Sequence, residues 1–143
     1  MCVSPFSRFQ TPTSRMMWLY EQSTGKLSST QSPFVAFGYS GASAGKNNPA
    51  MQSVRELGPI PQGIYAIGAP FDSIEHGPFA MRLAPDAANE MFGRSGFLMH
   101  GDSRQHPGCA SLGCIVIALA ARQVVSQSGD RGLRVLRGPA ASR

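Results

Sequence analysis

The chain has 143 residues, of which 42% are hydrophobic and 15% charged, and its net charge is +5. This composition excludes a disordered chain, which would combine low hydrophobicity with a high net charge, and the length suits a single domain. The basic residues form no block of about five like charges, so no nucleic-acid partner is expected. No stretch approaches the roughly 18 apolar residues of a membrane-spanning helix, so no membrane span is expected either.

The first half of the chain predicts short strands joined by turns. Residues 1–16 are rich in Ser, Thr and Pro, which predicts a flexible N-terminal arm, and they lack the apolar segment of a Sec signal. MWLYEQSTGKLSST predicts a hairpin that turns at Thr24-Gly25, and PFVAFGY predicts the next strand. Turn residues fill 40–49, which predicts a loop, and 51–57 is expected to form a short helix or an irregular turn.

The second half predicts further strands and then one helix. Strands are expected in GPIPQGIYAIG, FAMRL, FLMH and CIVI, because each contains a short run of apolar or β-branched residues. ALAARQVVSQSG favours a helix with Gly129 as its left-handed cap, and LRVLR predicts the last strand. The sequence therefore predicts a mainly β domain over 17–138 with one clear helix near the C-terminus, followed by a tail at 139–143.

The segment HGDSRQHPGCASLGC, residues 100–114, concentrates the reactive side chains of the chain. His100, His106, Cys109 and Cys114 are four potential zinc ligands, but their spacing fits poorly with the close cysteine pairs of structural zinc sites. A redox pair of Cys109 and Cys114 lacks the Cys-x-x-Cys spacing at a helix start. Both interpretations remain alternatives to a third.

The third interpretation is a cysteine nucleophile. A thiol of this kind needs a base, and it needs N–H groups directed at the oxygen that gains charge during acyl transfer. His100 ends a predicted strand and can take the proton of Cys114 if the two strands are neighbours. The N–H groups of Gly113 and Cys114 can form an oxyanion hole, and Ser111 either bonds the turn or assists that hole. Asp102 or a backbone carbonyl near Gly101 can orient the imidazole.

The pattern His100-Gly101 followed by Ser111-Leu112-Gly113-Cys114-Ile115 resembles the YkuD-like L,D-transpeptidases. GPIPQGIYAIG is similar to a strand of that family, with Ile60 where threonine is frequent. The blocks FGYSGASAGKNNP, HGPFAMRL, FGRSGFLMHGDS and ASLGCIVI narrow the resemblance to the L,D-transpeptidase effectors of type VI secretion systems. The similar blocks cover residues 18–135, nearly all of the chain outside the arm.

This resemblance implies a β-sandwich-like catalytic fold with a cleft over the cysteine and no metal or organic cofactor. It implies attack on the bond between the third and fourth residues of peptidoglycan stem peptides, with release or exchange of the terminal D-alanine through a thioester. It further implies delivery by a type VI secretion system to the periplasm of target bacteria, which agrees with the absence of a Sec signal in 1–16. A component of that system and a cognate immunity protein are the implied partners.

One position departs from the family pattern. Many L,D-transpeptidases carry a polar substrate-binding residue two positions after the nucleophile, where this chain has Val116. Another group must therefore bind the carboxylate of the substrate. The candidates for the cleft and for substrate binding are Tyr39, Lys46, His76, Arg82 and Arg94. Two other kinds of protein remain as alternatives, namely a zinc-stabilised binding module and a catalytically silent peptidoglycan-binding module.

Overall fold

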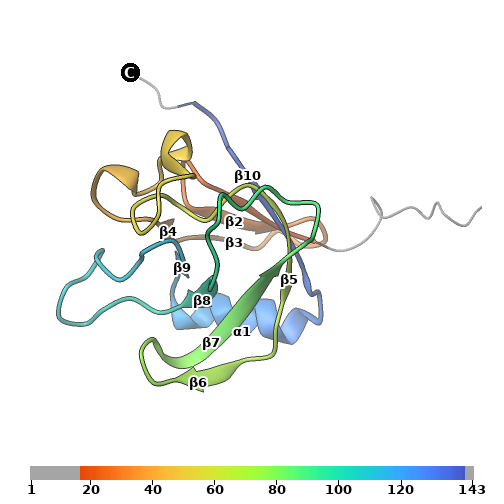
Figure 1. Cartoon of the computed structure of the whole chain (residues 1–143). Coiled ribbons are helices and arrows are strands. Elements are labelled where there is room, and N and C mark those ends of the chain that lie inside the picture. The colour runs from red at the N-terminus through yellow and green to blue at the C-terminus, as the bar shows by residue number, and fades with distance from the viewer. Residues whose placement is uncertain (1–16, 141–143) are drawn as a thin grey trace, which may run out of the picture.

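The computed structural model describes residues 17–140, so the predicted arm at 1–16 and the last three residues of the predicted tail lie outside the described residues. The elements are β1 (Trp18–Glu21), β2 (Lys26–Ser29), β3 (Val35–Phe37), β4 (Tyr39–Ser40), η3 (Ser43–Gly45), η4 (Pro49–Met51), β5 (Gly63–Ile67), β6 (Phe71–Ser73), β7 (Gly77–Pro85), β8 (Leu98–His100), β9 (Ile115–Val116), α1 (Leu119–Ser128) and β10 (Gly132–Leu136). The mainly β class and the single α-helix near the C-terminus are confirmed (Figure 1). Within 17–140, no helix is long and apolar enough to cross a membrane.

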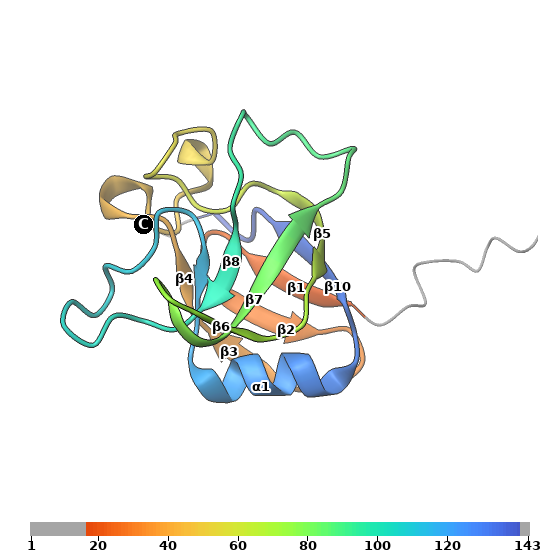
Figure 2. The same cartoon turned by 60° about the horizontal axis from the view of Figure 1, so that its bottom comes forward.

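The strands form one sheet that nearly closes on itself. Its order is β3-β2-β1-β10-β5-β7-β8-β9-β4, with β6 paired to β7 (Figures 1 and 2). The two end strands, β3 and β4, are separated in the chain by Gly38 alone, so the sheet must curl to bring them together. A Cβ at Gly38 would collide with the carbonyl group of Val116, which explains why a residue without a side chain stands at this closure.

The hairpin predicted at Thr24-Gly25 is confirmed, because β1 and β2 pair antiparallel across that turn. The predicted strand 33–39 is interrupted at Gly38 and forms β3 and β4. Residues 40–49 are a loop as predicted, although it includes the short 3-10 helix η3. The strand expected in CIVI is shorter than predicted and leaves Cys114 just outside β9.

The core lies inside the curled sheet and under α1. In β5 and β10 every second side chain is buried, as the alternation of a strand with one covered face requires. Tyr65, Leu133 and Val135 are thereby directed into the core. Helix α1 contacts β7 and β8 through a face that includes Ala121 and Val125, and it ends at Gly129 with a φ of 75°. The helix thus covers the same strands that lead to the reactive segment (Figure 2).

Candidate active site

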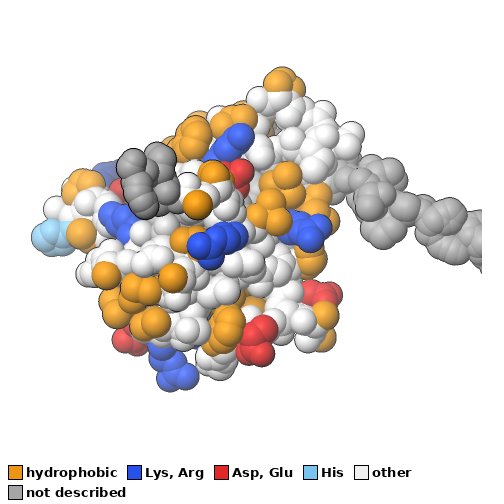
Figure 3. Space-filling view, turned by 90° about the horizontal axis from the view of Figure 1, so that it is seen from above, with side chains coloured by type: hydrophobic (Ala, Val, Ile, Leu, Met, Phe, Trp, Pro, Cys, Tyr) orange, Lys and Arg blue, Asp and Glu red, His pale blue; other side chains and the backbone are white. Residues whose placement is uncertain are grey.

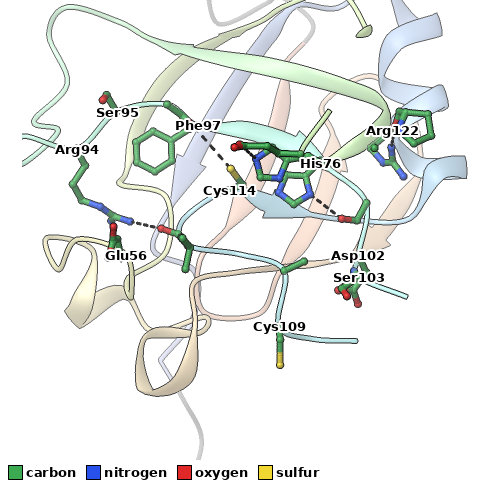
Figure 4. A pocket seen from close by; sticks show the side chains of 18 of the residues that line it. Glu56, His76, Arg94, Ser95, Phe97, Asp102, Ser103, Cys109, Cys114 and Arg122 are labelled. Atoms are coloured by element: carbon green, nitrogen blue, oxygen red, sulfur yellow. Dashed lines mark hydrogen bonds and ion pairs between the residues drawn. The ribbon is translucent and has the colours of Figure 1, made fainter. Parts of the chain in front are cut away.

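A large cleft opens above β8 and the segment that precedes β9. Its volume is about 1240 Å³, and residues from six stretches of the chain line it. The lining residues include Arg55, His76, Arg94, Phe97, His100, Gly101, Asp102, Arg104, Cys109, Cys114 and Arg122. The cleft therefore contains the two residues predicted as nucleophile and base, together with charged groups on both of its sides (Figure 4).

Cys114 lies immediately before β9, and its thiol is half-buried. The Sγ atom accepts a hydrogen bond from the N–H of Leu98 at 3.3 Å, so the thiol is held against the first residue of β8. Burial raises the pKa of the Cys114 thiol above its ordinary value of 9.0, although the Leu98 N–H and the charge of Arg94 act in the opposite direction. The thiol is therefore mainly protonated at neutral pH and needs a base during the reaction.

His100 is the last residue of β8, and only 1% of it is exposed. Its Nδ1 atom lies 2.8 Å from the carbonyl oxygen of Gly101. Because a carbonyl only accepts, we assign the imidazole proton to Nδ1, which leaves a lone pair on Nε2. Nε2 is buried and has no hydrogen-bond partner within 17–140. A neutral imidazole with one nitrogen fixed and the other available is the arrangement that a general base needs.

The electrostatic environment keeps His100 neutral. Burial lowers the pKa of His100 below its ordinary value of 6.5, and the charges of His76 and Arg122 add to this, whereas the Gly101 hydrogen bond and Asp102 oppose it. The His76 ring stacks on the His100 ring with centroids 4.3 Å apart and an interplanar angle of 24°. His76 reaches this position from the turn between β6 and β7, and it lines the cleft.

Strand pairing brings Cys114 and His100, the residues predicted as nucleophile and base, to one cleft. β8 and β9 are parallel neighbours, with Met99 opposite Ile115. Met99 and Ile115 are fully buried in the core, and residues one position away point to the opposite face of a strand. Cys114 and His100 accordingly line the cleft together. In the resting structure their side chains are not hydrogen bonded to each other.

The turn that leads into Cys114 is fixed by two serine hydroxyl groups. Ser111 Oγ accepts from the N–H of Gly41 at 2.8 Å and from the N–H of Gly113 at 3.0 Å, and it donates to the Cys114 carbonyl at 2.7 Å. Ser40 Oγ donates to the Gly113 carbonyl at 2.9 Å. Gly113 has a φ of +138°, which an L side chain rarely adopts. The Gly113 N–H, predicted as an oxyanion donor, is therefore already engaged in this structure.

Asp102 stabilises a loop and has no hydrogen bond to the imidazole. Its carboxylate accepts from the hydroxyl of Tyr39 at 2.7 Å and from the N–H groups of Ser103 and Gly108. The Tyr39 hydroxyl in turn accepts from the N–H of Ala110 at 2.8 Å. Of the two groups considered for orienting His100, the backbone carbonyl is the one in contact. Tyr39 and Asp102 together fix the loop that follows β8.

Arg94 was expected to bind substrate, and its contacts show a structural role instead. Arg94 is 6% exposed, and its guanidinium donates to four backbone carbonyl oxygens. Nη1 donates to Gln52 and Pro59, at 2.6 and 2.8 Å, and Nη2 donates to Gly58 and Leu112, at 3.0 and 3.3 Å. All four Nη hydrogens are thereby used, so this side chain holds the segment before β5 against the turn that carries the nucleophile.

Two other substrate-binding candidates lie away from the cleft. Lys46 is exposed and packs over the Tyr39 ring, with Nζ 4.6 Å from the centroid. Arg82 is exposed on β7, and its guanidinium lies 4.2 Å from the centroid of the Phe71 ring. Lys46 and Arg82 do not line the cleft, and the third candidate, Tyr39, does not line it either. The aromatic rings that Lys46 and Arg82 contact were not predictable from local patterns, because each ring belongs to another element of the structure.

Arg122, a buried residue of α1, lines the cleft but was not among the predicted site residues. The helical period offered a signal, because Arg122 lies three residues before the buried Val125 and next to the buried Ala121. A charged residue on the buried face of a helix needs partners, which makes it a candidate for a site. Ser40, which supports the nucleophile turn, carried no such signal.

The zinc alternative receives no support from the positions of its ligands. Within residues 17–140, no three His, Cys, Asp or Glu side chains are gathered as metal ligands. His106 is exposed on the loop after β8 and does not line the cleft. Cys109 is exposed, and Figure 4 shows its sulfur directed away from Cys114.

Residues 35–133 match the model of the protein family described as the Tlde1 domain. The match includes every residue that lines the cleft. The chain belongs to the Tlde1 domain family. Members of this family are type VI secretion effectors of the L,D-transpeptidase type, with activity directed at peptidoglycan. No curated protein and no solved structure shows significant similarity to the chain.

Replacement of Arg94 by methionine in this Tlde1 domain is expected to lower the free energy of unfolding by at least about 3 kcal/mol. The reason is that a buried carbonyl left without its donor costs about 1–3 kcal/mol, and Arg94 serves two buried carbonyls, those of Gly58 and Pro59, and two that are partly buried. Urea unfolding followed by circular dichroism measures the change. Arg82→Met is the matched control, because exposed Arg82 contacts only a ring, and a change of less than about 1 kcal/mol is expected. Equal effects of both variants would contradict the structural role of Arg94.

The rate at which iodoacetamide alkylates Cys114 is expected to rise with pH to a midpoint above 9.0, because burial raises the pKa of this thiol. Only the thiolate reacts, so the rate follows the deprotonated fraction. Peptide mapping by mass spectrometry reports on Cys114 separately from the other cysteines. A midpoint near neutral pH would instead reveal a resting thiolate paired with a protonated His100.

Proposed function

We propose that the protein is a cysteine-dependent L,D-carboxypeptidase and L,D-transpeptidase that acts on peptidoglycan stem tetrapeptides. The observation that carries this proposal is the available Nε2 of His100 in the cleft that also exposes the Cys114 thiol. Membership of the Tlde1 domain family supports peptidoglycan as the substrate. The cleft volume of about 1240 Å³ can accommodate a short peptide, and its mixed charges suit a stem peptide with free carboxylates.

The proposed reaction begins when Cys114 Sγ attacks the carbonyl carbon of the third stem residue while His100 Nε2 takes the thiol proton. The C–N bond to the terminal D-alanine then breaks, and His100 returns the proton to the departing nitrogen. Water or the amine of a D-amino acid attacks the resulting thioester and gives its proton to His100, which passes it to the departing Cys114 sulfur. Hydrolysis yields a tripeptide, and an amine acceptor yields an exchanged tetrapeptide.

The oxyanion of each tetrahedral intermediate needs donors that are not already used. The N–H of Gly113 is bonded to Ser111, whereas the N–H of Cys114 has no recorded partner within 17–140. We therefore assign the Cys114 N–H as the backbone donor to the oxyanion, in place of the pair predicted from the sequence. Ser111 and Ser40 act as positioning residues for this N–H through the carbonyls on either side of it.

The family also suggests where the reaction takes place. Type VI effectors are delivered into other bacteria, so we propose that this protein acts in the periplasm of target cells and that the producer makes a cognate immunity protein. Basic and acidic side chains are scattered in separate groups on the face shown in Figure 3. That pattern supports a small anionic peptide as the partner more than a nucleic acid.

The test is mass spectrometry of a purified tetrapeptide muropeptide that is incubated with the protein under reducing conditions, with and without D-methionine. Loss of one alanine shows hydrolysis, and replacement of alanine by methionine shows exchange. Binding of the muropeptide without any change in its mass would contradict the proposed enzyme and would favour the silent binding module. Bound zinc in the purified protein, with unfolding on chelation, would favour the zinc-stabilised module.

A further inference from the structure

Arg122 has a guanidinium group that is held at the wall of the cleft with two of its five N–H donors unused. Its Nε donates to the carbonyl of Ile117 at 3.0 Å, and its Nη1 donates to the carbonyls of Pro78 and Phe79, each at 2.9 Å. Its Nη2 has no recorded acceptor within 17–140, and it is not among the fully buried polar atoms that lack a partner. Nη2 therefore retains two N–H groups without an acceptor, on a side chain that lines the cleft.

This free end of Arg122 lies on the His100 side of the nucleophile. A Cβ built on Gly101 would come within 2.7 Å of Nη2, so the guanidinium touches the residue whose carbonyl holds the imidazole. Figure 4 shows Arg94 and Arg122 on opposite sides of Cys114, with His76 on the Arg122 side. The charge of Arg122 also acts on the pKa of His100, whereas the charge of Arg94 acts on the pKa of Cys114.

The other arginines of the cleft are less suited to hold an anion. Arg94 donates all four of its Nη hydrogens to backbone carbonyls. Arg55 and Arg104 are exposed, so each would lose side-chain entropy when it bound a ligand. Arg122 is only 6% exposed and is already fixed by three hydrogen bonds, so its remaining donors are preorganised.

The chemistry of the leaving group indicates which substrate group lies near Arg122 Nη2. His100 must protonate the departing nitrogen, so that nitrogen lies on the His100 side of Cys114. In a stem tetrapeptide the departing nitrogen belongs to the terminal residue, and its carboxylate is separated from that nitrogen by a single carbon atom. We propose that Arg122 Nη2 binds this terminal carboxylate and thereby restricts the enzyme to stem peptides with a free C-terminus, a specificity that rests on the function proposed above.

The first test compares two substrates on the wild-type protein: a muropeptide that ends in D-alanine and the same muropeptide that ends in D-alaninamide. A hydrogen bond to a charged group contributes about 1.5–3 kcal/mol, so kcat/KM is expected to be about 10- to 100-fold higher for the acid than for the amide. Equal rates on both substrates would overturn the role of Arg122 and leave the proposed function intact. Cleavage of neither substrate would instead contradict the proposed function.

The second test asks whether Arg122 causes the preference. Arg122→Lys and Gly101→Ala are each expected to reduce the acid-to-amide ratio toward one. The lysine removes Nη2, and the alanine methyl displaces Nη2 without removing the arginine, at a glycine whose φ is not positive. Because a ratio is measured on each preparation, a general loss of activity or of folded protein cancels. Arg104→Gln is the matched control and should keep the wild-type ratio. A preference that survives in both Arg122→Lys and Gly101→Ala would overturn the assignment.

Discussion

Cys114→Ala is expected to abolish both hydrolysis and exchange, because no thioester can form without the sulfur of the proposed nucleophile. The half-buried position of Cys114 makes the loss of one sulfur atom a small perturbation of the core. The measurement is the mass of the muropeptide after incubation with excess protein, together with the thermal midpoint of unfolding. The variant should unfold within a few degrees of the wild type and leave the muropeptide unchanged.

Cys109→Ala provides the matched control for this variant. Cys109 is exposed, lines the same cleft and is directed away from the nucleophile, so its removal should leave the rate of alanine release close to that of the wild type (Figure 4). Activity that survived in Cys114→Ala and disappeared in Cys109→Ala would place the nucleophile on the loop after β8. Activity that survived in both variants would exclude a cysteine mechanism that uses either thiol.

His100→Gln is expected to lower kcat/KM by about 10²- to 10⁴-fold, which is the usual contribution of a positioned general acid and base. Glutamine is similar in size but has no nitrogen that titrates, so neither proton transfer of the cycle can use it. The effect should be large here because the Cys114 thiol is protonated at rest, as its raised pKa implies. Steady-state kinetics of D-alanine release measure the loss.

His106→Gln is the corresponding control, since this histidine is exposed and stands six residues further along, outside the cleft. It should retain wild-type kinetics. A loss of less than about tenfold in His100→Gln, with a folded protein, would show that another group takes the thiol proton. The stacked His76 would then be the next residue to replace, because its ring contacts that of His100.

The Cys114 thiol and the His100 imidazole are both neutral before substrate binds. The pKa of Cys114 is raised and that of His100 is lowered, both mainly by burial, so the two shifts disfavour a resting thiolate and imidazolium. Proton transfer must then accompany attack on the substrate carbonyl. Such an enzyme protects its thiol from oxidation while it waits for substrate, because oxidants attack the thiolate.

Much of the fold was predictable from local patterns. Alternating burial in β5 and β10, the turn at Thr24-Gly25 and the left-handed Gly129 all depend on residues close in the sequence. These features are set by side-chain period and backbone freedom, which a short segment expresses by itself. The short strand β6 was missed, since three residues with mixed burial carry too little pattern.

The sequence by itself determined which residues are the candidates for the chemistry, because the His100-Gly101 and Ser111-to-Cys114 patterns lie within fifteen residues of one another. Only the tertiary structure decided which groups these residues contact. The parallel pairing of β8 with β9 brings the proposed base and the proposed nucleophile to one cleft, and the closure of the sheet places Ser40 beside Gly113. The tertiary structure also decided which arginine can bind an anion. Arg94 donates its Nη hydrogens to backbone carbonyls, whereas Arg122 retains donors without an acceptor. Hydrogen-bond partners of this kind come from segments distant in the chain, so no local pattern encodes which donors remain free.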